Sequence, residues 1–198
     1  NHTFFMREFE HFEYLKRVVL PQLRISEQKH RDLCIWCGAA STGQESYMLA
    51  MLLKEFFGLE HDTWDTKVLA TDISMEALNH AVKGVYDKEQ IESLPDSWKR
   101  RFLRSIDNGN RFEITKEIKD EVLFRKLNLM DEFPFKRRMH IVFLRNVMIY
   151  FDKETKDELI AKVYEAMEPG GYLFVGRTET IDRSGTPFHM IQPSIFRK

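Results

Sequence analysis

The sequence predicts an α/β fold with a mostly parallel, doubly wound sheet and a small antiparallel insertion. Apolar runs of strand length alternate with segments whose apolar residues recur at helical spacing, which is typical of a parallel sheet with helices on both faces. Residues 86–120 break this alternation and contain a turn-like DNGN (107–110), so we expect a small inserted subdomain there. The chain has 198 residues, of which 43% are hydrophobic, enough for one domain with a substantial core.

The first half of the chain predicts three helices and two strands. Residues 5–20 carry apolar side chains at helical spacing, and Pro21 either ends or kinks this helix. Residues 33–37 form a short apolar strand that ends at Gly38. The next elements are a helix over 45–57 with Gly58 as its C-cap, a buried strand within KVLATDIS (67–74) that ends at Asp72, and a helix over 75–82 with Ser74 as its N-cap.

The second half predicts a hairpin and then a return to the alternating pattern. A short helix over 93–105, opened by Pro95, leads through DNGN into RFEIT (111–115), so an antiparallel hairpin is expected. The later elements are strands over 122–129 and 139–146, a helix over 153–167 that ends before PGG (169–171), a strand over 172–176, and an edge strand from IFRK (195–198).

Composition excludes several classes of protein. The net charge of -1 gives no reason to expect a nucleic-acid or membrane partner. No apolar run approaches the roughly 18 residues that a membrane span needs. The N-terminal NHTFFMREFEHF is amphipathic and charged, unlike a signal peptide, and its abrupt start favours a fragment of a longer protein.

The two cysteines, Cys34 and Cys37, form a C-x-x-C pair. A zinc site needs four ligands, but there is no second pair, and the seven histidines lack ligand spacing. In a strand over 33–37, residues three apart point to opposite faces, which disfavours both shared ligation and a disulfide. We therefore expect two structural cysteines, no metal site and a reduced, cytoplasmic protein.

Polar residues follow each buried strand, and in a parallel sheet they meet at one edge, where ligands bind. The loop CGAASTGQE (37–45) follows the first strand, and Asp72 ends the second. Gly38 and Gly43 have the spacing of a phosphate-binding loop, but Gln44 and Glu45 replace its Lys and Ser/Thr, and an acid there repels a triphosphate.

Asp72 is placed to accept both hydroxyls of a ribose, a contact worth roughly 1.5–3 kcal/mol when charge-assisted. Its alternative role is to cap the helix that follows. Together, these features indicate an adenosine-type ligand with few phosphates in acidic surroundings. S-adenosylmethionine fits this description, because it carries a positive sulfonium and no phosphate.

Seven strings in order carry a resemblance that covers nearly the whole chain: NHTFFMRE, IWCGAASTGQESY, LATDIS, KGVYD, VLFRKLNL, FLRNVMIYFD and PGGYLFVGRTE. Together they resemble the catalytic domain of the CheR chemotaxis receptor methyltransferases. The resemblance implies a Rossmann-like class I S-adenosylmethionine-dependent methyltransferase and a protein-glutamate O-methyltransferase activity on chemoreceptor cytoplasmic helices, with S-adenosylhomocysteine as product. The piece at 86–120 then corresponds to the small β-subdomain of the family.

The resemblance also implies site residues. Arg7 and Tyr150 match the polar groups that flank the methyl-transfer position, and Arg7 also belongs to the cofactor-contacting set. The full cofactor-binding set is Asn1, Thr3, Arg7, Glu45, Asp72, Asn128, Leu129, Asn146 and Val147.

The sequence departs from the family pattern at three places. Gln44 and Ser46 replace an acid and a proline in the loop, and Arg177 with Thr178 alters the usual G-H-S-E. The hairpin around DNGN is short, which argues against tethering to a receptor C-terminal pentapeptide. In the family a helical domain normally precedes the catalytic domain, and we expect it to lie outside this chain. We also expect a monomer.

The chemistry implied by this resemblance needs no general base, because a glutamate carboxylate, with a reference pKa near 4.3, is ionised at neutral pH. Arg7 is suited to orient either the substrate's or the cofactor's carboxylate, and Tyr150 to donate to the substrate carboxylate; the alternative for Tyr150 is an aromatic core position. The competing functions are a methyltransferase with another substrate and a cofactor-binding signalling module. A nicotinamide dehydrogenase is disfavoured, since its glycine pattern is missing.

Overall fold

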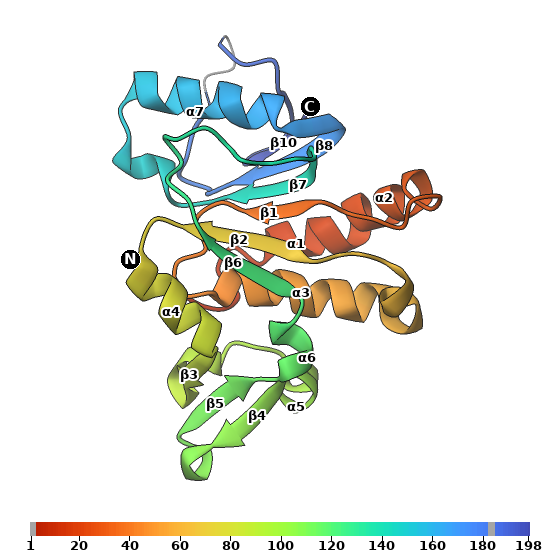
Figure 1. Ribbon diagram of the computed structural model, residues 1–198, viewed down its shortest axis with the longest axis vertical. Helices are drawn as coiled ribbons and strands as arrows, with labels where there is room; N and C mark the ends of the chain where they lie inside the picture. The colour runs from red at the N-terminus through yellow and green to blue at the C-terminus, as the bar shows by residue number, and fades with distance from the viewer. Residues whose placement is uncertain (1–2, 182–184) are drawn as a thin grey trace.

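The computed structural model describes residues 3–181 and 185–198, built around a seven-stranded sheet (Figure 1). In spatial order the strands are β6 (Val122–Lys126), β2 (Val68–Asp72), β1 (Ile35–Cys37), β7 (Met139–Leu144), β8 (Met167–Val175), β10 (Ile195–Arg197) and β9 (His189–Gln192). The first five run parallel, while β10 is antiparallel to both of its neighbours. The predicted mostly parallel α/β sheet is confirmed.

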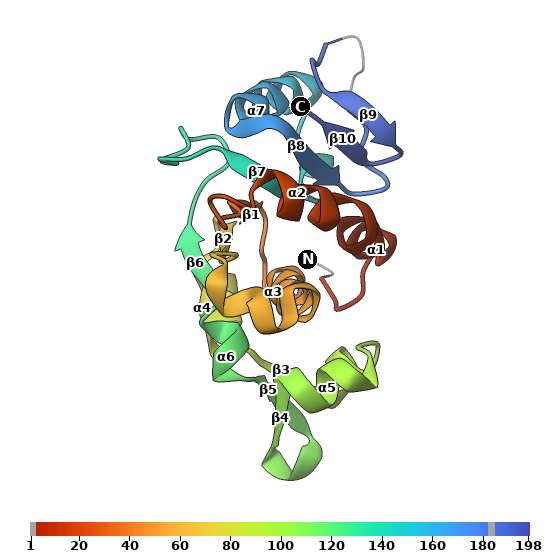
Figure 2. The ribbon, with the colours of Figure 1, turned by 90° about the vertical axis from the view of Figure 1, so that its right-hand side faces the viewer.

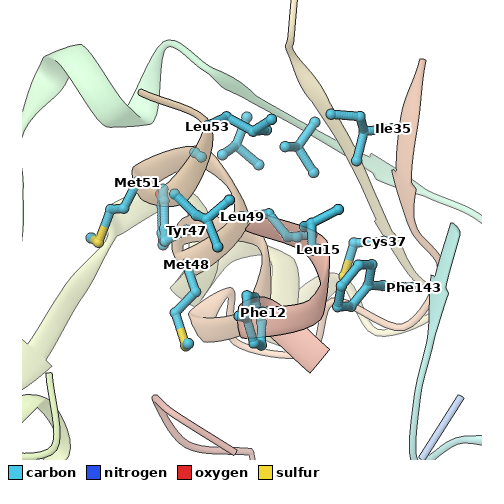
Figure 3. Packing of buried hydrophobic residues seen from close by; sticks show 14 of the residues in the cluster. Phe12, Leu15, Ile35, Cys37, Tyr47, Met48, Leu49, Met51, Leu53 and Phe143 are labelled. Atoms are coloured by element: carbon cyan, nitrogen blue, oxygen red, sulfur yellow. The ribbon is translucent and has the colours of Figure 1, made fainter. Parts of the chain in front are cut away.

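Helices cover both faces of this sheet, as the edge-on view in Figure 2 shows. On one face lie α1 (Glu10–Tyr14), a π-helical turn (Leu15–Val19), α2 (Leu20–Ser26) and α3 (Gln44–Phe57), and α7 (Lys153–Glu165) covers the opposite face. Strand β7 serves both layers because its side chains alternate: Ile141 and Phe143 join the first core, Val142 and Leu144 the second. Figure 3 shows Phe143 beside Cys37 in the first layer, and its ring centroid lies 5.4 Å from that of Phe12.

The N-terminal helix differs from the prediction at both ends. It begins at Glu10 rather than residue 5, and it continues through Pro21 to Ser26. Termination at Pro21 is therefore wrong. The π-helical turn Leu15–Val19 precedes the proline, and the backbone at Val19 and Leu20 is helical, so the helix continues into α2 without a break.

The C-terminal part of the sheet also differs. Strand β8 starts at Met167, so PGG (169–171) lies inside it at an irregularity in its pairing with β7. A Cβ on Gly171 would come within 2.9 Å of the Glu168 carbonyl oxygen, which explains why glycine fits there. The predicted edge position of IFRK is wrong, because β10 pairs with β8 on one side and β9 on the other.

A second, three-stranded antiparallel sheet extends away from the first at the lower end of Figure 1. Its strands are β3 (Val85–Asp87), β5 (Arg111–Ile114) and β4 (Leu103–Ile106), accompanied by α5 (Asp96–Phe102) and α6 (Lys116–Lys119). The predicted hairpin through DNGN is confirmed. Tyr86 ties this sheet to the core, donating its hydroxyl to the Thr42 carbonyl over 2.6 Å and contacting Phe5 edge-to-face.

The two cysteines lie on opposite faces of the main sheet. Cys37 packs with the core beneath α3, and Cys34 packs on the α7 side. Both are free thiols, so the expectation that they do not pair is confirmed. Among the described residues, none of the helices combines the length and apolar character needed to cross a membrane.

Candidate functional site

A cavity of about 540 Å³ opens at the carboxyl ends of β1, β2, β6 and β7. This is the edge at which ligands bind in open parallel sheets, and the volume lies within the range of small-molecule sites. The predicted site residues in its lining are Thr3, Arg7, Glu45, Asp72, Asn128, Leu129, Asn146, Val147 and Tyr150. The remaining predicted residue, Asn1, lies outside the described part of the chain.

Asp72 joins two loops at the end of β2. Its Oδ2 accepts the backbone N–H of Ser41 over 2.8 Å, and its Oδ1 accepts that of Ser74 over 2.9 Å. The helix α4 (Met75–Lys83) is capped by Ser74, whose hydroxyl accepts from the Ala77 N–H, so Asp72 is not its side-chain cap. Each carboxylate oxygen keeps acceptor capacity for a hydroxyl in the cavity.

The loop after β1 depends on glycine. Gly43 has φ +98°, and a Cβ there would approach the Ala81 Cβ to 2.9 Å. Gln44 accepts the Thr42 hydroxyl over 2.8 Å and does not line the cavity. With Gln44 in place of an acid, Glu45, the first-turn acid of α3, is the residue of this loop that brings a negative charge to the cavity.

Glu45 lies between a thiol and a guanidinium. Its Oε1 accepts the Cys37 S–H over 3.2 Å, and its Oε2 is 2.8 Å from Nη1 of Arg145. Burial raises the pKa of Glu45, and the positive charge of Arg145 opposes that rise. Burial also raises the pKa of Cys37 well above its ordinary value, so this thiol stays protonated as a donor.

Arg145, directly after β7, is a central residue to which sequence reasoning gave no role. Its side chain is 1% exposed, and Nη2 donates to the Arg7 carbonyl over 2.6 Å and to Glu8 over 3.2 Å. Although Nη1 faces Glu45 as an ion pair, neither it nor Nε has an aligned hydrogen-bond acceptor among the described residues. Its place directly after a strand was the one feature of the sequence that pointed to this residue. Its partners are too far away in the sequence to be inferred from a local pattern.

Glu8 is the second carboxylate held by Arg145. Burial raises the pKa of Glu8, but Arg145 and hydrogen bonds from Asn146 and the Arg177 backbone outweigh it, so the net pKa is lowered. The Asn146 amide donates to Oε1 over 3.3 Å. Glu8 is thus an ionised anchor that does not itself line the cavity.

Glu179 holds the segment after β7 and was also missed as a functional residue. This carboxylate, 7% exposed, accepts the backbone N–H groups of Asn146 and Met148, both over 2.7 Å, and of Gly176 over 2.6 Å. Asn146 adopts φ +57°, a conformation that needs such support. Glu179 therefore fixes the backbone that presents Asn146 and Val147 to the cavity.

The cavity mouth combines a cation with exposed aromatic side chains. Tyr150 is 67% exposed, so the alternative of a core position for it is wrong. Phe4 is 54% exposed, and the Arg7 guanidinium lies 5.7 Å from its ring centroid. Arg7 and Tyr150 both line the cavity, close to solvent access.

The donor set fits a ligand with hydroxyls, a positive charge and an apolar ring. Asp72 and Glu45 provide carboxylates, and Ile73, Leu129 and Val147 provide apolar surface. The Lys and Ser/Thr of a phosphate-binding loop are replaced by Gln44 and Glu45, and of these Glu45 lines the cavity. S-adenosylmethionine has the matching ribose hydroxyls, cationic sulfonium, ammonium and adenine.

Comparisons with related sequences agree with this chemistry. A family model described as "CheR methyltransferase, SAM binding domain" matches residues 1–196. A chemotaxis protein methyltransferase of Borreliella burgdorferi is 38% identical, covering 100% of this chain and 70% of that protein. Chemotaxis protein methyltransferase 2 of Pseudomonas aeruginosa is 38% identical, covering 90% and 63%. The glycopeptide N-methyltransferase MtfA, solved with S-adenosyl-L-methionine, aligns at 17% identity and a TM-score of 0.44, covering 72% of this chain and 43% of MtfA.

Proposed function

Because the chain belongs to the CheR methyltransferase family, we propose that it methylates glutamate side chains on the cytoplasmic helices of a chemoreceptor. The methyl donor of the family's domain is S-adenosylmethionine. The observation that carries the proposal is the single cavity that brings Glu45 and Asp72 together with Arg7 and Tyr150. The first pair suits the donor, and the second pair suits a carboxylate acceptor at the mouth.

The interior residues of the cavity would hold the donor. Asp72 would accept the two ribose hydroxyls on the lone pairs that Ser41 and Ser74 leave free. Asn128 and Leu129, after β6, would border the adenine, and Thr3 would contact the donor from the N-terminal segment. Glu45 would pair with the ammonium of the methionine end, a charge-assisted contact worth roughly 1.5–3 kcal/mol.

The residues at the mouth would orient the acceptor. Bound S-adenosylmethionine supplies an electrophilic methyl group on its sulfonium. A glutamate carboxylate is already ionised at neutral pH, so no side chain needs to remove a proton. Arg7 and the Tyr150 hydroxyl would direct the carboxylate toward the methyl carbon, and Phe4 and Ile149 would give the acceptor an apolar surface to pack on. Positioning of this kind contributes on the order of 7–11 kcal/mol to catalysis.

The test incubates the protein with S-adenosylmethionine labelled in its methyl group and a chemoreceptor cytoplasmic fragment. We expect base-labile methyl esters on the fragment, and their loss when its methylated glutamates are replaced by alanine. Tight binding of the donor without any ester on receptor fragments would contradict the proposal. That result would favour another substrate or a cofactor-binding signalling role.

A further inference from the structure

The geometry points to Arg145 as a positioning residue that holds the N-terminal segment 3–9 next to Glu45 in the first turn of α3. This inference rests on the proposed function, since it concerns how the same cavity is kept ready for its donor and acceptor. Arg145 connects three parts of the chain: the end of β7, the segment 3–9 and the first turn of α3. Arg145 thus contacts both Glu8 and Glu45.

The directional bonds of Arg145 go to the N-terminal segment. Nη2 donates to the Arg7 carbonyl over 2.6 Å and to Oε2 of Glu8 over 3.2 Å. The contact with Glu45 is different, because Nη1 approaches Oε2 to 2.8 Å without hydrogen-bond alignment. Arg145 therefore balances the charge of Glu45, while Oε2, which accepts no aligned hydrogen bond from it, keeps lone pairs available for a ligand ammonium.

The N-terminal segment needs this support because its backbone is strained. Met6 and Glu8 have φ of +66° and +50°, which L-residues adopt at a cost. Glu8 is held by Arg145, by the Asn146 amide over 3.3 Å and by the Arg177 N–H over 3.3 Å. This arrangement fixes the backbone on both sides of Arg7, whose side chain lines the cavity.

Charge placement gives the same conclusion. Arg145 is a buried cation between two carboxylates, of which Glu45 lines the cavity and Glu8 does not. A substitution at Glu8 should therefore change the affinity for a bound donor through Arg145, although Glu8 itself does not line the cavity. If Arg145 is a positioning residue, substitutions at Glu8 and at Arg145 should have non-additive effects on the affinity for the donor.

The test measures binding of S-adenosylhomocysteine by calorimetry to Arg145→Lys, Arg145→Met, Glu8→Gln and the double variant Glu8→Gln/Arg145→Lys. We expect Arg145→Met to bind at least about tenfold more weakly and Arg145→Lys to recover part of that loss, because lysine keeps the charge but not the fork. Glu8→Gln should bind about three- to tenfold more weakly. The double variant should lose no more than Arg145→Lys alone.

A matched control is Glu55→Gln, the same carboxylate-to-amide change at another ion pair. Glu55 pairs with Lys16 over 2.6 Å and does not line the cavity. It should change affinity less than about twofold even if it lowers the melting temperature. Wild-type affinity in Glu8→Gln, or additive losses in the double variant, would overturn the inference. If Arg145→Met does not fold, Arg145→Lys and Glu8→Gln still decide the question.

This experiment separates the inference from the proposed function, because S-adenosylhomocysteine binding needs no receptor. Coupled affinities without receptor methylation would uphold the role of Arg145 and contradict the proposed substrate. Receptor methylation together with additive effects of the substitutions on affinity would uphold the proposed substrate and contradict the role of Arg145.

Discussion

The backbone N–H of Ser41 donates to Oδ2 of Asp72 over 2.8 Å, which joins the loop after β1 to the end of β2. The same carboxylate accepts from Ser74 over 2.9 Å. Asp72 therefore has two roles, one in holding these loops and one, as we propose, in binding a ribose. A substitution of Asp72 therefore tests the ribose contact only if the variant keeps its fold.

Asp72→Asn is expected to weaken S-adenosylhomocysteine binding by about 10- to 100-fold, since a charged acceptor for the ribose hydroxyls is lost. The amide oxygen still accepts one of the two backbone N–H groups, so the fold should persist. Calorimetry measures the affinity, and circular dichroism checks the fold. Wild-type affinity in a folded variant would remove Asp72 from the donor site.

Tyr150→Phe is expected to lower the methylation kcat by about 10- to 100-fold, because one hydrogen bond to an ionised acceptor disappears. Donor affinity should stay within about twofold, and stability within about 0.5 kcal/mol, because this side chain is 67% exposed. Tyr164→Phe on α7, where the ring packs on Phe188, is the control and should leave kcat unchanged. Equal losses of kcat and affinity would assign Tyr150 to donor binding.

Glu179→Gln is expected to destabilise the protein, because its carboxylate serves three backbone N–H groups and an amide has one acceptor oxygen. Each donor left unsatisfied costs about 1–3 kcal/mol of unfolding free energy. For a chain of this size, 1 kcal/mol lowers the melting temperature by about 2–4 °C. Glu132→Gln, at an exposed position, should shift it hardly at all, and equal shifts in both variants would refute the role of Glu179.

His11 predicts a pH dependence of stability. Burial, reinforced by the charge of Arg145, lowers its pKa from 6.5 to about 4, although Glu8 and Glu10 act in the opposite direction. The unfolded chain then binds the extra proton between these values, so stability falls as the pH drops from about 6.5 toward 4. Between pH 7 and pH 5 the histidine's contribution is about 2 kcal/mol.

The measurement compares chemical denaturation of the wild type and His11→Gln at pH 7 and pH 5. The variant should lose about 2 kcal/mol less over this interval. His189→Gln, at an exposed position in β9, serves as the control and should follow the wild type. Parallel losses in the wild type and His11→Gln would show that His11 is not the group responsible.

Local signals in the sequence predicted most of the sheet and part of the site. Apolar runs located β1, β2, β6 and β7, because buried parallel strands are continuous hydrophobic segments. The rule that strand ends converge then placed Glu45 and Asp72 in one cavity, where the structure has them. The family resemblance added Arg7 and Tyr150, which no local pattern would have singled out.

Other features depend on contacts between residues far apart in the chain. Arg145 binds Glu8 and the Arg7 carbonyl 137 and 138 positions away, and Glu179 binds Asn146 33 positions away. Strand β9 was missed because HMIQ is short and half-exposed, with no apolar run of its own. Pro21 was taken as a possible end of the helix, but the helix continues through it into α2 directly after a π-helical turn.

The most direct test of the central claim is a crystal structure of the protein grown with S-adenosylhomocysteine. We predict one molecule in the cavity, with its ribose hydroxyls within about 3.2 Å of the Asp72 carboxylate and its ammonium at Glu45. Its sulfur should face Arg7 and Tyr150. Density for the ligand elsewhere on the molecule, or with the sulfur turned away from the mouth, would contradict the account.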